Sequence, residues 1–469
     1  MTSLADITPP IALGALDGRY RPAVAPLVDH LSEAALNRAR VHVEVEWLIH
    51  LTDRQVVPGV RQLTEAEIAR LRAIVANFGA EDIAELAEIE RETVHDVKAV
   101  EYYLKRRMPA ILGEDAAQLS ELVHFACTSE DINNLCYALM VKGAVQTVWL
   151  PKAEDLLDQL SGMATELADV PMLARTHGQA ATPTTMGKEL AVLAYRLRRQ
   201  VRRIASADFL GKINGATGTY GAHVAAVPEA DWPAIGNAFV TDRLGLTWNP
   251  LTTQIESHDW QAELYSDVAR FNRILHNLCT DVWTYISLGY FAQVRGQGTV
   301  GSSTMPHKVN PIRFENAEAN LEVSNALFDV LASTLVQSRM QRDLTDSSMQ
   351  RNIGTAFGHS LLALDNVSRG LAGLDAVPAQ MAADLDANWE VLGEPVQSAM
   401  RALGAQGVTG MENPYERLKE LTRGRRIDGD DLREFVRGLG LPDDVEQRLL
   451  GLTPQTYIGL APELARRYI

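Results

Sequence analysis

The sequence predicts an all-α protein whose centre is a bundle of long helices. Four segments place apolar residues at alternating spacings of three and four, which keeps them on one stripe of a helix. The longest stripe runs about from Asp259 to Phe291, and the others lie near 150–167, 190–204 and 317–335. Such narrow stripes favour packing at shallow crossing angles, within one chain or against another subunit. We find no run of alternating strands between regular turns, so we expect no large sheet.

Shorter helical patterns flank this centre on both sides. One runs about from Thr64 to Phe78, and Thr64 followed by Glu67 is typical of a capping box. Within the centre, Pro151 is suited to the first turn of the helix near 150–167. From about residue 371 the segments shorten and their charge rises. We therefore predict three helical domains, at 1–118, 119–370 and 371–469.

Composition and charge argue against several classes of protein. The 469 residues include 44 Lys and Arg and 60 Asp and Glu, which gives a net charge of −16. This negative charge argues against nucleic acid or an anionic membrane as the main partner. The apolar runs fall short of the ~20 residues that span a bilayer, and the first residues do not resemble a secretory signal. Three cysteines, an odd count, fit a reducing cytoplasm. We expect a cytoplasmic protein.

Metal and dinucleotide motifs are not convincing here. Residues 296–301 match GxGxxG, but that fingerprint functions only between a strand and a helix, and here a long helical pattern precedes it. A mobile glycine-rich loop is the better interpretation. No HExxH, paired CxxC or EF-hand spacing occurs, so we expect no bound metal.

The most unusual segment is 301–316, GSSTMPHKVNPIRFEN. It places two hydroxyls, a lysine, an amide and a carboxylate in a loop that becomes a helix near Pro311. Such groups could hold an oxyanion or activate a serine. A surface loop with a helix cap is the structural alternative.

His177, in RTHGQ, lies between two long helix patterns and is therefore expected on a tight connecting loop. Histidine is the side chain most easily poised to transfer a proton near neutral pH. A structural hydrogen-bonding role is the alternative.

Three further motifs are candidates for binding. The first, ETVHDVKAVEYYLK, places His95 on a helix face beside Asp96, although a solvated face would look the same. The second, HFACTSEDINN, resembles a helix N-cap at Thr128 and Ser129, whose amides could bind a carboxylate or phosphate. The third, SRMQRDLTDSSMQRNIG, suits a phosphate or a charged helix face. Its polar residues are Arg339, Arg342, Ser347, Ser348 and Arg351.

Together these motifs resemble a known family. GSSTMPHKVNP is similar to the signature of the fumarase/aspartase superfamily. RTHGQxATPTTxGKE, CTSEDINN, TxHDVKAVEY, TTQIExHD and QRDLTDSSMQRN resemble adenylosuccinate lyases of the long bacterial type. The resemblance runs from LDGRY at 16–20 to LTPQTYIG at 452–459. It implies an all-α homotetramer whose central domains form the tetramer core, with active sites shared between subunits and no metal or organic cofactor.

The resemblance also implies a reaction and its residues. Fumarate would be eliminated from adenylosuccinate, giving AMP, and from the succinyl-aminoimidazole carboxamide ribotide SAICAR, giving AICAR, in purine synthesis. His177 would be the general acid and Ser302 the general base. Lys308 and Asn310 would hold the succinyl carboxylate, and Glu315 would support the acid.

Further residues resemble substrate contacts of the family. The ribose-phosphate group comprises Arg19, Tyr20, Arg342, Ser347, Ser348 and Arg351, and the other contacts are His95, Asp96, Thr128, Ser129, Gln254 and Asn316. Val94 departs from the family pattern, which has a polar residue there, so that contact would fall to backbone atoms. A sister lyase with another leaving group and a non-catalytic relative remain alternatives. The cluster 342–351, which suits a phosphate, argues against a sister lyase. The presence of both His177 and Ser302 argues against a non-catalytic relative.

Overall fold

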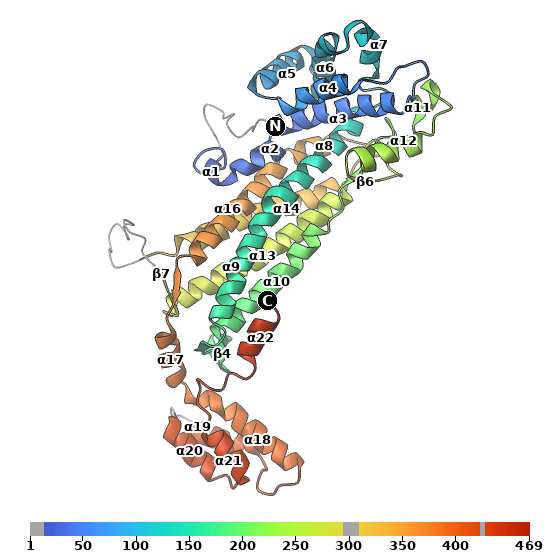
Figure 1. The fold of residues 1–469 in the computed structure, drawn as a ribbon. Coiled ribbons are helices and arrows are strands. Elements are labelled where there is room, and N and C mark those ends of the chain that lie inside the picture. Colours follow the sequence, from blue (N-terminus) through green and yellow to red (C-terminus); the bar gives the residue numbers. More distant parts are fainter. Residues whose placement is uncertain (1–13, 294–308, 423–426) are drawn as a thin grey trace. The chain divides into compact units, whose positions relative to one another are not determined.

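The computed structural model describes residues 14–293, 309–422 and 427–469 (Figure 1). They form two compact units. Among the described residues, unit 1 comprises 14–154, Gln200–Arg273 and Ala317–Asp365, and unit 2 comprises Asp155–Arg199, 274–293, 309–316, 366–422 and 427–469. Helices dominate the described residues, which confirms the predicted all-α class. No helix within the described ranges is both long and apolar enough to cross a lipid bilayer.

The first part of unit 1 is a series of helices and short 3₁₀ turns (Figure 1). They are α1 (Arg21–Val24), η1 (Ala25–Leu27), α2 (Val28–Leu31), α3 (Glu33–Asp53), α4 (Glu65–Ala76), α5 (Ala80–Thr93), α6 (Asp96–Leu112), η2 (Gly113–Asp115), α7 (Ala116–Leu119), η3 (Ser120–Leu122) and α8 (Ser129–Ala144). The predicted capping box at Thr64 is confirmed. The Thr64 N–H donates to Glu67 Oε2 (2.8 Å), and the Glu67 N–H donates to Thr64 Oγ1 (3.3 Å).

The long helices predicted from the apolar stripes are present. They are α9 (Leu150–Glu166), α10 (Met186–Ala205), α13 (Asp259–Ser287) and α14 (Ile312–Leu335). A further long helix, α16 (Ile353–Leu371), lies outside the four predicted stripes. Stripe residues such as Leu197, Phe271 and Phe328 are fully buried. Within unit 1, Tyr265 of α13 stacks on Phe328 of α14 at 5.4 Å between ring centroids.

One helix boundary differs from the predictions. Helix α13 ends at Ser287 rather than near Phe291, because Gly289 adopts a φ of +74° and the Tyr290 N–H donates back to the Tyr285 carbonyl at 2.8 Å. Pro151 lies in the first turn of α9, as the sequence predicted. It follows the π-helical turn η4 (Val145–Trp149), through which α8 continues directly into α9. Pro151 has no N–H to donate, and the wider π turn accommodates this loss.

Only two-stranded sheets occur in the described residues, as expected from the sequence. The antiparallel pairs are β1 (Pro171–Met172) with β4 (Thr184–Thr185), β2 (Arg175–Thr176) with β3 (Gln179–Ala180), and β7 (Phe291–Gln293) with β8 (Leu374–Ala376). The parallel pair is β5 (Leu210–Gly211) with β6 (Thr247–Trp248). Unit 1 also contains α11 (Gly221–Ala226), α12 (Trp232–Ala238), the π turn η5 (Phe239–Arg243) and α15 (Thr345–Gln350).

The last part of unit 2 has a core of its own. Its elements are α17 (Pro378–Asp386), η6 (Trp389–Leu392), α18 (Gly393–Ala405), α19 (Pro414–Thr422), α20 (Gly429–Arg437), α21 (Asp443–Leu450) and α22 (Ala461–Arg467). Helices α18 to α21 lie together in Figure 1. Leu392, Met400, Leu432 and Val436 are among the buried residues of this cluster. The shorter segments predicted after residue 371 are therefore confirmed.

Candidate active site

The amino-terminal turn of α8 is the centre of the candidate site in unit 1. Thr128 is the N-cap residue and Ser129 the first helical residue, as the sequence predicted. The Thr128 N–H donates to Asp131 Oδ2 at 2.9 Å, which closes the turn. Helix amino termini present backbone amides that suit an anionic ligand.

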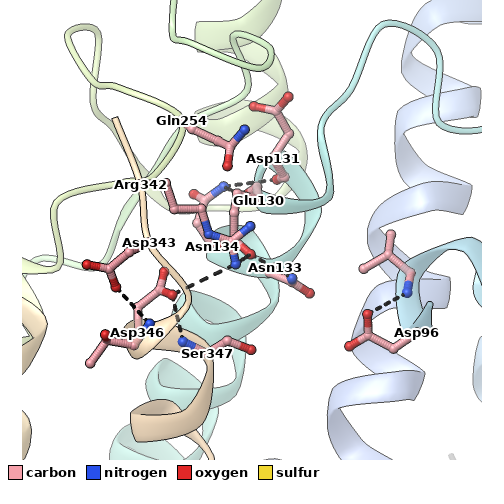
Figure 2. A network of polar contacts seen from close by, with 12 residues as sticks. Asp96, Glu130, Asp131, Asn133, Asn134, Gln254, Arg342, Asp343, Asp346 and Ser347 are labelled. Atoms are coloured by element: carbon pink, nitrogen blue, oxygen red, sulfur yellow. Dashed lines mark hydrogen bonds and ion pairs between the residues drawn. The ribbon is translucent and has the colours of Figure 1, made fainter. Parts of the chain in front are cut away.

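Two buried carboxylates in this turn bind cations from distant segments. Glu130 Oε1 lies 2.9 Å from Arg342 Nη2, and Asp131 Oδ1 lies 2.8 Å from Lys212 Nζ. Both Asp131 and Lys212 are 0% exposed, and Asp131 also accepts the Asn214 N–H at 2.9 Å. Figure 2 shows Glu130, Asp131 and Arg342 close together. The first turn of α8 thus binds two segments that are remote from it in sequence, one at Lys212 and Asn214 and the other at Arg342.

A second ionic cluster contains Asp96, Ser347 and Arg351. Asp96 Oδ2 lies 2.6 Å from Arg40 Nη2 and 3.5 Å from Arg351 Nη2. Arg351 Nη1 donates to Ser347 Oγ at 2.8 Å. Burial raises the pKa of Asp96, but the attraction of Arg40 outweighs this and the net pKa lies below its ordinary value. Asp96 is therefore ionised at neutral pH, and these three predicted residues are brought together.

His95 is placed differently from the prediction. It is the N-cap of α6 rather than a residue on a helix face, because its Nδ1 accepts the Lys98 N–H at 3.2 Å. Val94, just before it, is 88% exposed and has a φ of +51°. A β-branched residue rarely adopts this left-handed conformation, and such strain is often found at functional sites.

The remaining predicted residues of unit 1 lie on several segments. Arg351 lines a cavity of about 330 Å³ together with Asp17 and Glu33. Tyr20 packs on the small core formed by Leu16, Val24 and Leu362. Arg19 and Ser348 are exposed, and Gln254 Nε2 donates to the Ala216 carbonyl at 3.1 Å.

His177 of unit 2 occupies the tight loop that the sequence predicted. Strands β2 and β3 pair through a two-residue turn, in which His177 and Gly178 have φ values of +53° and +73°. Two positive φ angles are typical of a type I′ hairpin turn, which favours glycine or asparagine. The His177 ring is exposed and forms no hydrogen bond among the described residues. The turn therefore presents an accessible imidazole on a strained backbone.

The hairpin is anchored beside His177 by a polar group that sequence reasoning missed. Arg175 Nη1 donates to the Tyr290 hydroxyl at 3.1 Å, and Arg175 and Tyr290 both bind the Asp384 carboxylate. Burial raises the pKa of Tyr290 to about 12, so its hydroxyl remains protonated and donates. Three separate segments thus fix the base of the hairpin.

The unusual loop is described only in part. Ser302 and Lys308 lie outside the described residues. Asn310 is exposed, and α14 begins directly after Pro311, as predicted. Glu315 Oε1 accepts the Trp283 indole N–H at 3.2 Å, and Asn316 is half-buried.

The loop that leads into α8 is held by a buried carboxylate. Glu44 is fully buried, and its Oε1 lies 2.6 Å from His124 Nδ1 while Oε2 accepts the His124 N–H at 2.9 Å. Burial lowers the pKa of His124, but the Glu44 carboxylate outweighs this and raises it above the ordinary 6.5. The protonated ring is therefore favoured in the folded state.

This pair predicts a pH dependence of stability. A pKa raised by folding gives stabilisation that is complete below about pH 6.5 and is lost as the pH rises through the folded-state pKa. Between pH 6 and pH 9, we expect the urea midpoint of the wild type to fall more than that of His124→Gln. Urea unfolding at both pH values measures this difference, and parallel falls would show that the pair does not couple to folding.

Several residues of the site could not be identified from the sequence. Arg40, Glu44 and Lys212 occur in segments without a recognisable motif, and only their burial reveals them. His258 and Asp346 do belong to the quoted motifs TTQIESHD and QRDLTDSS. Both are buried, with His258 Nε2 3.5 Å from Asp346 Oδ2. Among the described residues, no group of three His, Cys, Asp or Glu side chains could hold a metal ion.

Comparisons of the sequence with known proteins agree on one family. Residues 18–323 match the sequence model of a family described as "Lyase", and residues 338–458 match "Adenylosuccinate lyase C-terminal". The adenylosuccinate lyase of Escherichia coli (strain K12) is 50% identical over 450 residues, covering 96% of this chain and 97% of the relative. That of Vibrio cholerae is 48% identical over 97% of this chain and 98% of its own. A solved fumarate lyase from Mesorhizobium sp. BNC1 has the same fold, with a TM-score of 0.74, 18% identity and coverage of 94% and 97%.

Proposed function

Because this chain belongs to the adenylosuccinate lyase family and is a lyase, we propose that it eliminates fumarate from adenylosuccinate, giving AMP, and from SAICAR, giving AICAR. The observation that supports this most strongly is the 50% identity to the Escherichia coli enzyme over nearly the whole length of both chains. A β-elimination needs an acid for the leaving nitrogen and a base for the succinyl β-carbon.

We assign these two roles to His177 and Ser302. The exposed ring of His177 on its hairpin supports the role of the acid, because nothing described covers it. Ser302 is a poor base in water and needs a desolvated site and a nearby cation, for which Lys308 is our candidate. Lys308 and Asn310 would stabilise the negative charge that develops on the succinyl group. Glu315 would act electrostatically on the acid.

We propose that unit 1 binds the nucleotide part of the substrate. Arg342, Ser347 and Arg351 combine guanidinium and hydroxyl donors that suit a phosphate. Arg351 contacts both Asp96 and Ser347. These contacts support one binding site that contains all three residues. The further contacts that we propose in unit 1 are Arg19, Tyr20, His95, Thr128, Ser129, Gln254 and Ser348. Asn316, which belongs to unit 2, is a separate proposed contact with the substrate.

We also propose a cytoplasmic homotetramer whose active sites are shared between subunits. Exposed apolar side chains on the long helices support an assembly, because a subunit interface would cover them. Tyr195 of α10 and Val323 and Val330 of α14 are examples, each more than 40% exposed. The division into three domains, at 1–118, 119–370 and 371–469, is part of the same proposal.

Fumarate release from defined substrates tests the proposed function. We expect the purified full-length protein to release fumarate from adenylosuccinate and SAICAR, and to remain active with a chelator present. Ultraviolet absorbance of fumarate measures the rate. Release from argininosuccinate or aspartate instead would indicate a sister lyase, and loss of turnover with the chelator would contradict a mechanism without a metal.

A further inference from the structure

Arg342 is held at one end by carboxylates. Its Nη2 lies 2.9 Å from Glu130 Oε1 and 3.8 Å from Asp346 Oδ1, and its side chain is 19% exposed. Its buried Nε has no hydrogen-bond partner among the described residues. The guanidinium is therefore fixed through Nη2, and it retains donors that no described group occupies.

Glu130 is itself fixed from the other side. Asn133 Nδ2 donates to Glu130 Oε1 at 2.8 Å, and Asn133 Oδ1 accepts Arg40 Nε at 3.0 Å. Arg40 in turn binds Asp96, the partner of Arg351. A continuous polar chain therefore connects the two arginines of the proposed phosphate site. Its members are Arg342, Glu130, Asn133, Arg40, Asp96 and Arg351.

A gain in the stability of the fold alone does not explain this series of polar contacts. Removing a carboxylate from water costs several kcal/mol, and well-packed apolar residues often replace buried ion pairs without loss. Glu130 is only 2% exposed, and burial raises its pKa. The contacts of Glu130 instead serve to orient the Arg342 guanidinium, because a fixed pair of N–H donors binds a phosphate more strongly than a mobile one.

We propose that Glu130 is a positioning residue that orients Arg342 toward the phosphate of the substrate without touching the substrate. This inference rests on the proposed function. It assigns to Glu130 an effect on substrate affinity that depends on Arg342, whereas a purely structural residue would affect stability in any background.

A double-mutant cycle tests this dependence. We expect Glu130→Gln to raise KM for adenylosuccinate about tenfold and to change kcat less than threefold. In an Arg342→Met background, the same replacement should change KM less than twofold, because its effect passes through Arg342. Asp343→Asn is the matched control, since Asp343 binds the exposed Arg339 at 3.3 Å in the same loop, and its KM should stay within twofold. A tenfold rise in both backgrounds, or no rise in either, would overturn the proposal.

Affinity for AMP gives a second readout that needs no turnover. Calorimetry should give a Kd about tenfold higher for Glu130→Gln than for the wild type, and equal values would refute the role of Glu130. If Glu130→Gln does not fold, Glu130→Asp replaces it in the test, because it keeps the negative charge on a shorter side chain. We expect Glu130→Asp to raise the Kd for AMP as well. A wild type that binds AMP but releases no fumarate would contradict the proposed function and leave the AMP comparison decisive for Glu130.

Discussion

Replacing His177 by alanine is expected to lower kcat by ~10² or more, as for the loss of a general acid. The departing nitrogen must receive a proton, and without the imidazole only water can supply it. Because a general acid acts on the departing nitrogen mainly in the transition state, we expect little change in KM. Steady-state kinetics with adenylosuccinate measure both constants. A wild-type rate would remove His177 from the mechanism.

The backbone at His177 provides a matched pair of variants. At a φ of +53°, alanine remains strained, whereas glycine adopts this conformation without strain. We therefore expect His177→Gly to lose as much activity as His177→Ala and to have the higher Tm of the two. This result would separate the chemical role of the ring from the geometry of the turn.

Ser302→Ala should lose activity to a similar extent, and the two inactive proteins test the proposed sharing of sites. Mixing His177→Ala with Ser302→Ala should restore part of the activity if each site takes the two groups from different subunits. Failure to recover activity, with subunit exchange demonstrated by labelled protein, would indicate that one chain supplies both groups.

Local features of this protein follow from its sequence, because neighbouring residues determine them. The apolar stripes of the long helices, the capping box at Thr64 and the tight turn at His177 all depend on residues a few positions apart. The errors are local as well. The helical spacing places His95 on a helix face, whereas the hydrogen bond that its Nδ1 accepts from the Lys98 N–H makes it the N-cap of α6.

The ion pairs of the site could not be predicted in this way. Glu130 and Arg342 are 212 positions apart, and Asp131 and Lys212 are 81 apart. No spacing rule joins such residues, because the packing of whole segments brings them together. A motif identifies chemically suitable residues, but the partner that orients each of them becomes visible only in the fold.

Replacing the buried Lys212 by methionine is expected to lower the free energy of unfolding by roughly 3–5 kcal/mol. Lys212 and Asp131 are both 0% exposed, and Lys212 Nζ also donates to the Gly215 carbonyl at 3.2 Å. Methionine fills a similar volume but leaves the Asp131 carboxylate in the interior without its cation. An uncompensated buried charge is among the few causes of so large a loss.

Urea unfolding measures this loss, and Lys152→Met on α9 is the control, because Lys152 is exposed and should change stability by less than about 0.5 kcal/mol. Asp131 also accepts the N–H groups of Asn214 and Gly215. We therefore expect Asp131→Asn to recover only part of the stability when it is combined with Lys212→Met, since an amide oxygen can still accept these bonds but binds them less strongly. Equal stability of Lys212→Met and the wild type would mean that the ion pair does not hold this part of the site, and that backbone hydrogen bonds to Asp131 are sufficient to fix the first turn of α8.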